Sequence, residues 1–276
     1  MNAGAHLLGS PKSSRVVVES AGSEAAPGRG AAALRRRRRA TPARLRAFVG
    51  RGLALLPALV VLLACDPYVK GNGVLREETR HVGAFEGLRV EDGIQADVTA
   101  GIETQRVAVS GDENLLEHVQ TSVRTDAAHG QVLEVRTTLS SFDSTHPIRV
   151  VVSVPVLRFL AATDACYATI AGAAAEIMSI DAADGADVRL DGPGGVQLSA
   201  RLTGGQRGGA HLDARDYDVE DATVELSGGA RAELHVGERV SGTVSGSGSA
   251  LENLGGGACE VVATDGATVS CTPGAG

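Results

Sequence analysis

Four aspartates between residues 181 and 191 form the densest group of side chains in the sequence that could do chemistry. They are Asp181, Asp184, Asp187 and Asp191. Closely spaced carboxylates can bind a hard cation such as Ca²⁺, and with a basic partner they could act as acid and base on a polysaccharide. The surrounding residues do not match the glycine–aspartate nonapeptide that binds calcium. We therefore interpret these side chains as solvated carboxylates at turns and predict no metal site.

The stretch from Ser245 to Ser249 invites a nucleophile interpretation because each serine is flanked by glycine. A hydrolase nucleophile of this kind lies at a strand-to-helix turn, and a phosphate-binding loop needs a following helix N-terminus. Strands are expected on both sides of this stretch, so a turn is the better interpretation. The sequence predicts no catalytic residue, no cofactor and no enzyme activity. The basic candidates are interpreted as surface side chains: His81, His118, His129, His146, His211, His235, Arg149, Arg158, Arg189 and Arg201.

The thiol of Cys65 is the most informative reactive group. It follows an apolar run over residues 53–64, preceded by basic residues. Twelve residues cannot span a bilayer core, which needs roughly 20 helical residues, so the layout is that of a secretory signal. The sequence Leu62-Leu63-Ala64-Cys65 resembles the lipobox of bacterial lipoproteins. This resemblance implies lipid transfer to Cys65 and cleavage after Ala64; the alternative is an ordinary signal peptide with an incidental cysteine.

The lipobox divides the chain into segments with different expected roles. Residues 1–47 are a basic, disordered leader whose length suggests a translation start downstream of Met1, and residues 48–64 are the signal peptide. Residues 65–73 form a lipidated tether, and residues 74–272 form one domain with an N-terminal part over 74–155 and a repeat part over 156–272. Asp66 is a candidate sorting residue, because an aspartate there holds enterobacterial lipoproteins in the inner membrane. We expect the protein at the bacterial cell envelope, with its domain periplasmic or surface-exposed.

The charge distribution separates the leader from the domain. Residues 1–64 contain 11 Lys/Arg and two acidic residues, a net charge of +9. The chain has 26 Lys/Arg and 33 Asp/Glu in all, so the remainder holds 15 basic and 31 acidic residues, a net charge of −16. An acidic domain repels nucleic acid and anionic lipid surfaces. Nucleic acid is therefore excluded as a partner.

Alternation of apolar and polar residues predicts strands through most of residues 74–155. Val150, Val152 and Val154 are one example. One stretch differs: residues 113–123 carry leucines and valine at helical spacing, which predicts a short helix with Asp112 as N-cap. Aromatic residues make up only 3% of the chain, so the core must be aliphatic.

A repeat of about 20 residues begins near residue 155. Taking Ala165, Gly185, Gly209, Gly229, Gly248 and Gly266 as equivalent turns, residues one, three and five places later are mostly apolar or small. This period predicts an all-β fold, a right-handed parallel β-helix or β-solenoid. The alternative is a meander of hairpins, in which residues 260–264 and 267–271 would pair across Asp265-Gly266. The ladders that the 20-residue repeat predicts, one for each turn position, are Cys166, Ala168, Ile170; Ala186, Val188, Leu190; Ala210, Leu212, Ala214; Ala230, Ala232, Leu234; Ser249, Leu251, Asn253; and Ala267, Val269, Cys271.

Three cysteines lie beyond the anchor. Cys166 and Cys271 fall on ladder positions, where a cysteine behaves as a small buried hydrophobe. Export also permits a disulfide, and Cys259 with Cys271 is the nearest pair in sequence. The odd count leaves at least one free thiol, and the sequence leaves the pairing open.

Residues 71–272 resemble the head GIN domain family, which is associated with autotransporter adhesins. The resemblance is carried by Gly71-Asn72-Gly73, by the stretch from Gly111 to Val123, by the apolar strand over residues 147–156 and by the Ser-Gly-Ser-Gly turn at Ser245. It implies an exported β-helical protein, and many members are lipoproteins. The chain departs from the family where other residues replace Ser-Gly-Ser-Gly, as at Asp164-Ala165, and where it ends at Thr272-Pro273, which predicts a poorly capped last coil.

These observations lead to two hypotheses about function. The first is a non-enzymatic envelope lipoprotein whose β-solenoid presents a surface for interaction, adhesin-like, with the membrane as partner through the lipid and a protein or glycan as surface ligand. The alternative is a carbohydrate-binding or carbohydrate-modifying β-helix. Sugar recognition commonly uses aromatic rings, and the chain offers only Tyr68, Tyr167 and Tyr217, which favours the first hypothesis.

Overall fold

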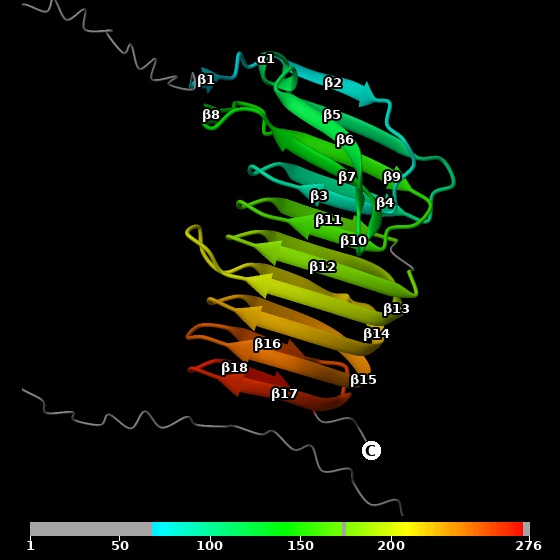
Figure 1. The fold of residues 1–276 in the computed structure, drawn as a ribbon, viewed down its shortest axis with the longest axis vertical. Helices are drawn as coiled ribbons and strands as arrows, with labels where there is room; N and C mark the ends of the chain where they lie inside the picture. Colours follow the sequence, from blue (N-terminus) through cyan, green and yellow to red (C-terminus); the bar gives the residue numbers. More distant parts are fainter. Residues whose placement is uncertain (1–67, 173–174, 273–276) are drawn as a thin grey trace, which may run out of the picture. The chain divides into compact units, whose positions relative to one another are not determined.

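The computed structural model describes residues 68–172 and 175–272 (Figure 1). Cys65, Ala64 and Asp66 lie outside these residues, as do the leader and the signal peptide. Within the described part of the chain, no helix is long and apolar enough to cross a membrane. The first half contains β1 (Val69–Lys70), β2 (Leu75–Arg80), β3 (Gly87–Val90), β4 (Gln95–Ala100), β5 (Arg106–Asp112), α1 (Glu113–Leu116), β6 (Val119–Asp126), β7 (Gly130–Thr137), β8 (Phe142–Asp143) and β9 (Arg149–Val154).

The second half is a stack of parallel strands. Three of them are long enough to bend from one side of the stack to the other: β13, β14 and β15. The strands are β10 (Phe159–Ala162), β11 (Tyr167–Ala171), β12 (Ile177–Ala183), β13 (Asp187–Thr203), β14 (His211–Ser227), β15 (Arg231–Ser245), β16 (Ala250–Asn253), β17 (Ala258–Thr264) and β18 (Thr268–Cys271).

Hydrogen bonding arranges these strands in two parallel stacks that form the two sides of a solenoid. The first face contains β9, β4, β11, the N-terminal halves of β13, β14 and β15, then β16 and β18. The second face contains β7, β3, β10, β12, the C-terminal halves of β13 to β15, and β17. Each coil gives one strand to each face, as the ascending rungs in Figure 1 show. The predicted all-β solenoid is confirmed.

The predicted ladders coincide with the strand register. Ala168 pairs with Val188, Val188 with Leu212, Leu212 with Ala232, Ala232 with Leu251 and Leu251 with Val269, all by parallel pairing. All but Val269, which is half-buried, are buried between the two faces. Burial of each leucine side chain stabilises the fold by about 1.5–3 kcal/mol. The core therefore gains a similar stabilisation from aliphatic side chains at every rung.

Tight turns join the second face to the first in each coil, and we call this stack of turns the turn edge. Its two central residues both have positive φ in several coils, for example Asp184 (50°) and Gly185 (80°), or Asp164 (58°) and Ala165 (60°). Aspartate tolerates this left-handed conformation better than most residues. Asp-Gly and Asp-Ala therefore replace Ser-Gly-Ser-Gly without changing the path of the chain.

The hairpin alternative is wrong. β17 pairs with β15 and β18 pairs with β16, both parallel, and β17 and β18 do not pair with each other. The turn at Asp265-Gly266 therefore carries the chain from one face to the other. A local two-residue turn cannot distinguish these outcomes; the 20-residue repeat does, because it supplies a parallel neighbour for each strand.

The predicted helix over residues 113–123 is too long. Only Glu113–Leu116 is helical, and Val119 begins β6, which pairs antiparallel with β7. The alternating β-branched residues of this stretch favour the strand, because long-range pairing outweighs a local helical spacing. Asp112 makes no side-chain cap; one of its carboxylate oxygens accepts instead from the backbone N–H of Thr145 at 2.7 Å.

The cysteines are distributed between core and disulfide. Cys166 is buried and free, as predicted from its ladder position. Cys271 differs from that prediction: it is half-buried and bonded to Cys259. The bond links β17 to β18 in the last coil described, where each strand has a parallel neighbour on one side only among the described residues.

Candidate functional site: outer faces and corner

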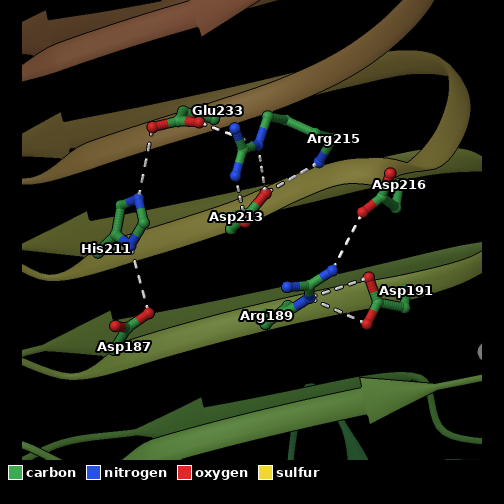
Figure 2. A network of polar contacts seen from close by, with 8 residues as sticks. All are labelled: Asp187, Arg189, Asp191, His211, Asp213, Arg215, Asp216 and Glu233. Atoms are coloured by element: carbon green, nitrogen blue, oxygen red, sulfur yellow. Dashed lines mark hydrogen bonds and ion pairs between the residues drawn. The ribbon is translucent and has the colours of Figure 1, made fainter.

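Charged side chains of the first face form a network across three rungs (Figure 2). On β14, Arg215 donates to Asp213 at 2.8 and 2.9 Å, and its Nε lies 3.0 Å from Glu233 of β15. His211 lies between two carboxylates, with Nδ1 3.2 Å from Asp187 and Nε2 3.8 Å from Glu233. These residues alternate with the buried ladder, so the β period places all of them on the outside.

A second arginine extends this network toward the corner of the solenoid. Arg189 donates to Asp191 at 3.0 Å and to Asp216 at 3.1 Å. The side-chain hydrogen bond to Asp191 raises the pKa of Arg189. The hydrogen bond from Arg215 lowers the pKa of Asp213 to about 2. Asp213 is therefore an ionised acceptor at neutral pH, and the two arginines offset part of the negative charge of the five carboxylates in the network.

The four clustered aspartates of the sequence do not converge on one site. Asp187 and Asp191 join the first-face network, Asp181 lies on the second face, and Asp184 lies on the turn edge. Asp184 accepts from the backbone N–H of Arg207 at 2.7 Å, and the Arg207 guanidinium also lies 2.6 Å from Asp164. Within the described residues, no group of three His, Cys, Asp or Glu side chains could hold a metal ion.

Hydroxyl side chains dominate the second face. Ser179, Ser199, Thr223 and Ser241 occupy successive rungs in register. A shallow depression of about 230 Å³ lies on this face, with the ion pair of Arg201 and Glu225 (2.8 Å) and hydroxyls of neighbouring strands in its lining. This face therefore offers hydrogen-bonding groups with little net charge.

The serines of the glycine-rich turn form hydrogen bonds with backbone groups. Ser249 is buried; its hydroxyl donates to the carbonyl of Ser245 at 2.7 Å and accepts from the N–H of Gly229 at 3.0 Å. Asn253, the next polar residue on this ladder, is also buried and bonds both backbone groups of Val236. Both positions tie neighbouring turns together, which agrees with the turn interpretation.

The tyrosines differ sharply in exposure. Tyr217 has no exposed surface and cannot form a platform for a sugar ring, so it is not among the rings available to the carbohydrate-binding alternative. Burial also raises the pKa of its hydroxyl. Tyr167 is 43% exposed on the first face, in register with Gln95 and Asp187 on either side. Of these two rings, Tyr167 is the one that a ligand can reach.

A larger depression lies where the first face turns into the second. Its volume is about 540 Å³, and its charged lining residues are Glu176, Asp218, Glu220 and Glu238. Sequence reasoning missed this site. The signal that could have found it is position within the repeat. Glu176, Glu220 and Glu238 each come immediately before the second-face segment of their coil. The first residues of these segments, Ile177, Asp221 and Arg239, stack in register, with Gln197 on the rung between Ile177 and Asp221.

A comparison with family models gives one match over the rungs just described. Residues 84–252 match the family described as "Putative auto-transporter adhesin, head GIN domain". The chain belongs to this family. The resemblance found in the sequence is therefore confirmed, and the matched head GIN domain extends from just before β3 into β16, which includes the charged network and both depressions.

Solved structures are similar to this chain at low sequence identity. A putative adhesin from Bacteroides fragilis is 13% identical with a TM-score of 0.53, and the alignment covers 74% of this chain and 100% of that chain. A putative lipid binding protein from Parabacteroides distasonis is also 13% identical, with a TM-score of 0.48 and coverage of 75% and 100%. A comparison with curated proteins finds no match. At these identities, the likeness to solved structures concerns the fold alone.

Proposed function

We propose that the chain is a non-enzymatic cell-envelope lipoprotein that displays its head GIN domain as an adhesin-like interaction module. The observation that carries the proposal is the family match over residues 84–252. A lipid on Cys65 would hold the domain at a membrane surface, since two or more acyl chains give stable anchoring. The −16 charge of the mature chain keeps the domain off anionic lipid.

The surfaces of the solenoid suit such a role. Parallel rungs repeat at about 4.7–4.9 Å, so side chains of one column form a regular array on a rigid backbone. Many charges of the faces are neutralised in pairs, as for Asp97 with Arg149 and Glu225 with Arg201. Such a surface can contact a large partner without a deep cleft.

Membrane fractionation of cells that produce the full chain tests the anchor. We expect Cys65→Ser to move the protein from the membrane fraction to the soluble envelope fraction, because the acylated thiol is lost. Cys166→Ala is the matched control; it removes a buried thiol and should leave the protein in membranes. An unchanged membrane-bound fraction in Cys65→Ser would show that the lipid anchor is wrong.

Adherence of the same cells tests the adhesin-like role. Cells with the anchored chain should bind a second cell layer severalfold better than cells with an empty vector, and Cys65→Ser should abolish the gain. Equal adherence of anchored and vector cells would contradict this role while leaving the anchor intact.

Exposed Tyr167 favours a second candidate function, carbohydrate binding on the first face. Its ring lies beside the Gln95 amide and the Asp187 carboxylate in register, which together could stack on and hydrogen-bond a sugar. A glycan array with the full chain should then show binding that Tyr167→Ala abolishes and Tyr217→Phe retains. An array without reproducible binding would rule out this candidate.

A further inference from the structure

The most exposed large hydrophobic side chains of the described residues gather at one end of the solenoid. Leu75, Tyr68 and Val74 are 63%, 61% and 52% exposed, more than any other large hydrophobic side chain described. They lie next to β1 and at the start of β2, which Figure 1 shows with α1 at the end of the stack opposite β17 and β18. We call this end, with these three side chains, the proximal end. Such a concentration of exposed apolar surface marks an interaction site.

Hydrogen bonds hold the chain to the domain where it enters the proximal end. β1 pairs in parallel with β8, and the N–H of Gly71 donates to the carbonyl of Asp143 at 2.7 Å. The Asn114 side chain bonds two more backbone groups: its Oδ1 accepts from the N–H of Asn72 at 2.8 Å, and its Nδ2 donates to the carbonyl of Lys70 at 2.9 Å. The chain from β1 onward is therefore part of the folded domain.

The length of chain before β1 limits how far the proximal end can lie from the proposed lipid. Only Asp66 and Pro67 separate Cys65 from Tyr68. Three residues of extended chain span at most about 11 Å, and the headgroup layer on each side of a bilayer core is roughly 5–8 Å thick. A lipid on Cys65 would therefore hold the proximal end within the headgroup layer or directly beside it.

The residue types at the proximal end are those that suit a headgroup layer. A tyrosine there keeps its ring in the apolar part and its hydroxyl in the wet part, and a lysine extends its ammonium group toward the phosphates. Lys70, two residues after Tyr68, is the single lysine that follows Cys65. Residues 68–80 hold three basic and two acidic residues, a net charge of +1, whereas residues 65–276 carry −16. An anionic membrane therefore repels this stretch less than it repels the domain as a whole.

We propose that Tyr68, Val74 and Leu75 insert into the headgroup layer of the membrane that carries the lipid on Cys65. The lipid and the three side chains then fix the orientation of the domain, with the proximal end on the membrane and the C-terminal rungs farthest from it. Both faces of the solenoid are open to a partner in this orientation. The inference rests on the proposed function, because it takes the lipid anchor as given and adds how the interaction module is displayed.

An environment-sensitive label on the lipidated protein, reconstituted into vesicles of phosphatidylethanolamine and phosphatidylcholine, tests this orientation. Cys166 is buried and the other two described cysteines are bonded to each other, so an added cysteine is labelled selectively. We expect a nitrobenzoxadiazole label on Leu75→Cys to emit at shorter wavelength with vesicles and to be quenched by a nitroxide-bearing phospholipid. The matched control is Val262→Cys on β17, an exposed position at the opposite end, which should show neither effect.

Flotation of the same vesicles separates the possible failures. A protein that floats with the vesicles while the Leu75→Cys label is unchanged would overturn the inference and leave the lipid anchor intact. Equal quenching at Leu75→Cys and Val262→Cys would also overturn it, since the domain would then lie flat on the membrane. A protein that does not float would overturn the anchor itself, and the inference with it.

Replacing the inserted side chains separates insertion from mere proximity to the lipid. With the label on Val74→Cys, the additional changes Tyr68→Ser/Leu75→Ser should remove most of the quenching, although the protein still floats. Tyr167→Ser/Ile177→Ser is the matched control; it removes two exposed hydrophobic side chains of the rungs and should retain the quenching. Equal quenching in both variants would contradict insertion. A shift in emission that the nitroxide does not quench would show that a second copy of the chain, and not the bilayer, covers the proximal end.

Discussion

The turn edge and the opposite corner, which carries the column of Glu176, Val196, Glu220 and Glu238 and which we call the acidic corner, connect the same two faces in different ways. On the turn edge, short turns with left-handed residues repeat from coil to coil, and Arg207 bridges the carboxylates of Asp164 and Asp184. At the acidic corner, register shifts open the stack, and Glu176, Glu220 and Glu238 form a column without arginine. Since either side must only reverse the chain, the difference indicates that the regular turn edge is the more constrained of the two sides.

Replacing a glycine with valine should give the largest difference in stability between the turn edge and the acidic corner. Gly185 on the turn edge has φ of 80°, and a β-carbon there would lie 2.9 Å from the backbone carbonyl of Arg207. We expect Gly185→Val to lower the free energy of unfolding by about 3 kcal/mol, from left-handed strain and from the clash.

Gly237 at the acidic corner is the matched control. A β-carbon there would have a single ordinary contact, 3.8 Å from the carbonyl of Val219, so Gly237→Val should change stability by less than about 0.5 kcal/mol. Urea unfolding measures both variants. Similar losses would contradict the view that the turn edge is the constrained side.

Acid titration measures how much a paired carboxylate of the first face contributes to stability. Arg215 depresses the pKa of folded Asp213 to about 2, below the ordinary value of 3.8. A depressed pKa contributes stability that is present above the unfolded pKa and is lost as pH falls from about 4 toward 2. We expect this loss to be about 1 kcal/mol, since Arg215 is half exposed and solvent screens the pair.

Asp213→Asn should therefore flatten the stability profile between pH 4 and 2 in urea titrations. Asp143→Asn, an exposed carboxylate distant in sequence from the network, is the control and should leave the slope unchanged. An Asp213→Asn profile as steep as that of the unmodified protein would mean that the ion pair contributes nothing.

The sequence contains most of the information that determines the rungs. Alternation places Val188, Leu212 and Ala232 in one buried ladder, and the 20-residue repeat gives the register that the structure has. One feature depends on long-range pairing and was predicted wrongly: the helix ends at Leu116 and does not continue to residue 123, because Val119 begins β6. The burial of Tyr217 is a feature on which the sequence made no prediction. A tyrosine next to a corner has no local mark of burial; it is buried because the chain turns over it.

The candidate site was harder to predict for a related reason. The cluster of four aspartates in the sequence is divided between the second face (Asp181), the turn edge (Asp184) and the first face (Asp187 and Asp191), because the chain passes from strand to turn to strand within it. The column of the acidic corner is spread over 63 residues, from Glu176 to Glu238, and is found only when repeats are aligned at their second-face strands. Spacing across repeats, more than local density, identifies a surface of a solenoid.

Reversing the charge of Arg207 tests how much the ion pairs of the turn edge contribute to stability, and its effect should be the smallest. The guanidinium is about half exposed, so Arg207→Glu should cost only about 0.5–1 kcal/mol in urea unfolding. The substituted side chain would join Asp164 and Asp184 in a cluster of three carboxylates on the turn edge. The left-handed turns of this edge are unchanged in the variant, so we expect a much smaller loss than in Gly185→Val. A loss as large as that of Gly185→Val would show that the ion pairs, and not the turn conformation, constrain the turn edge.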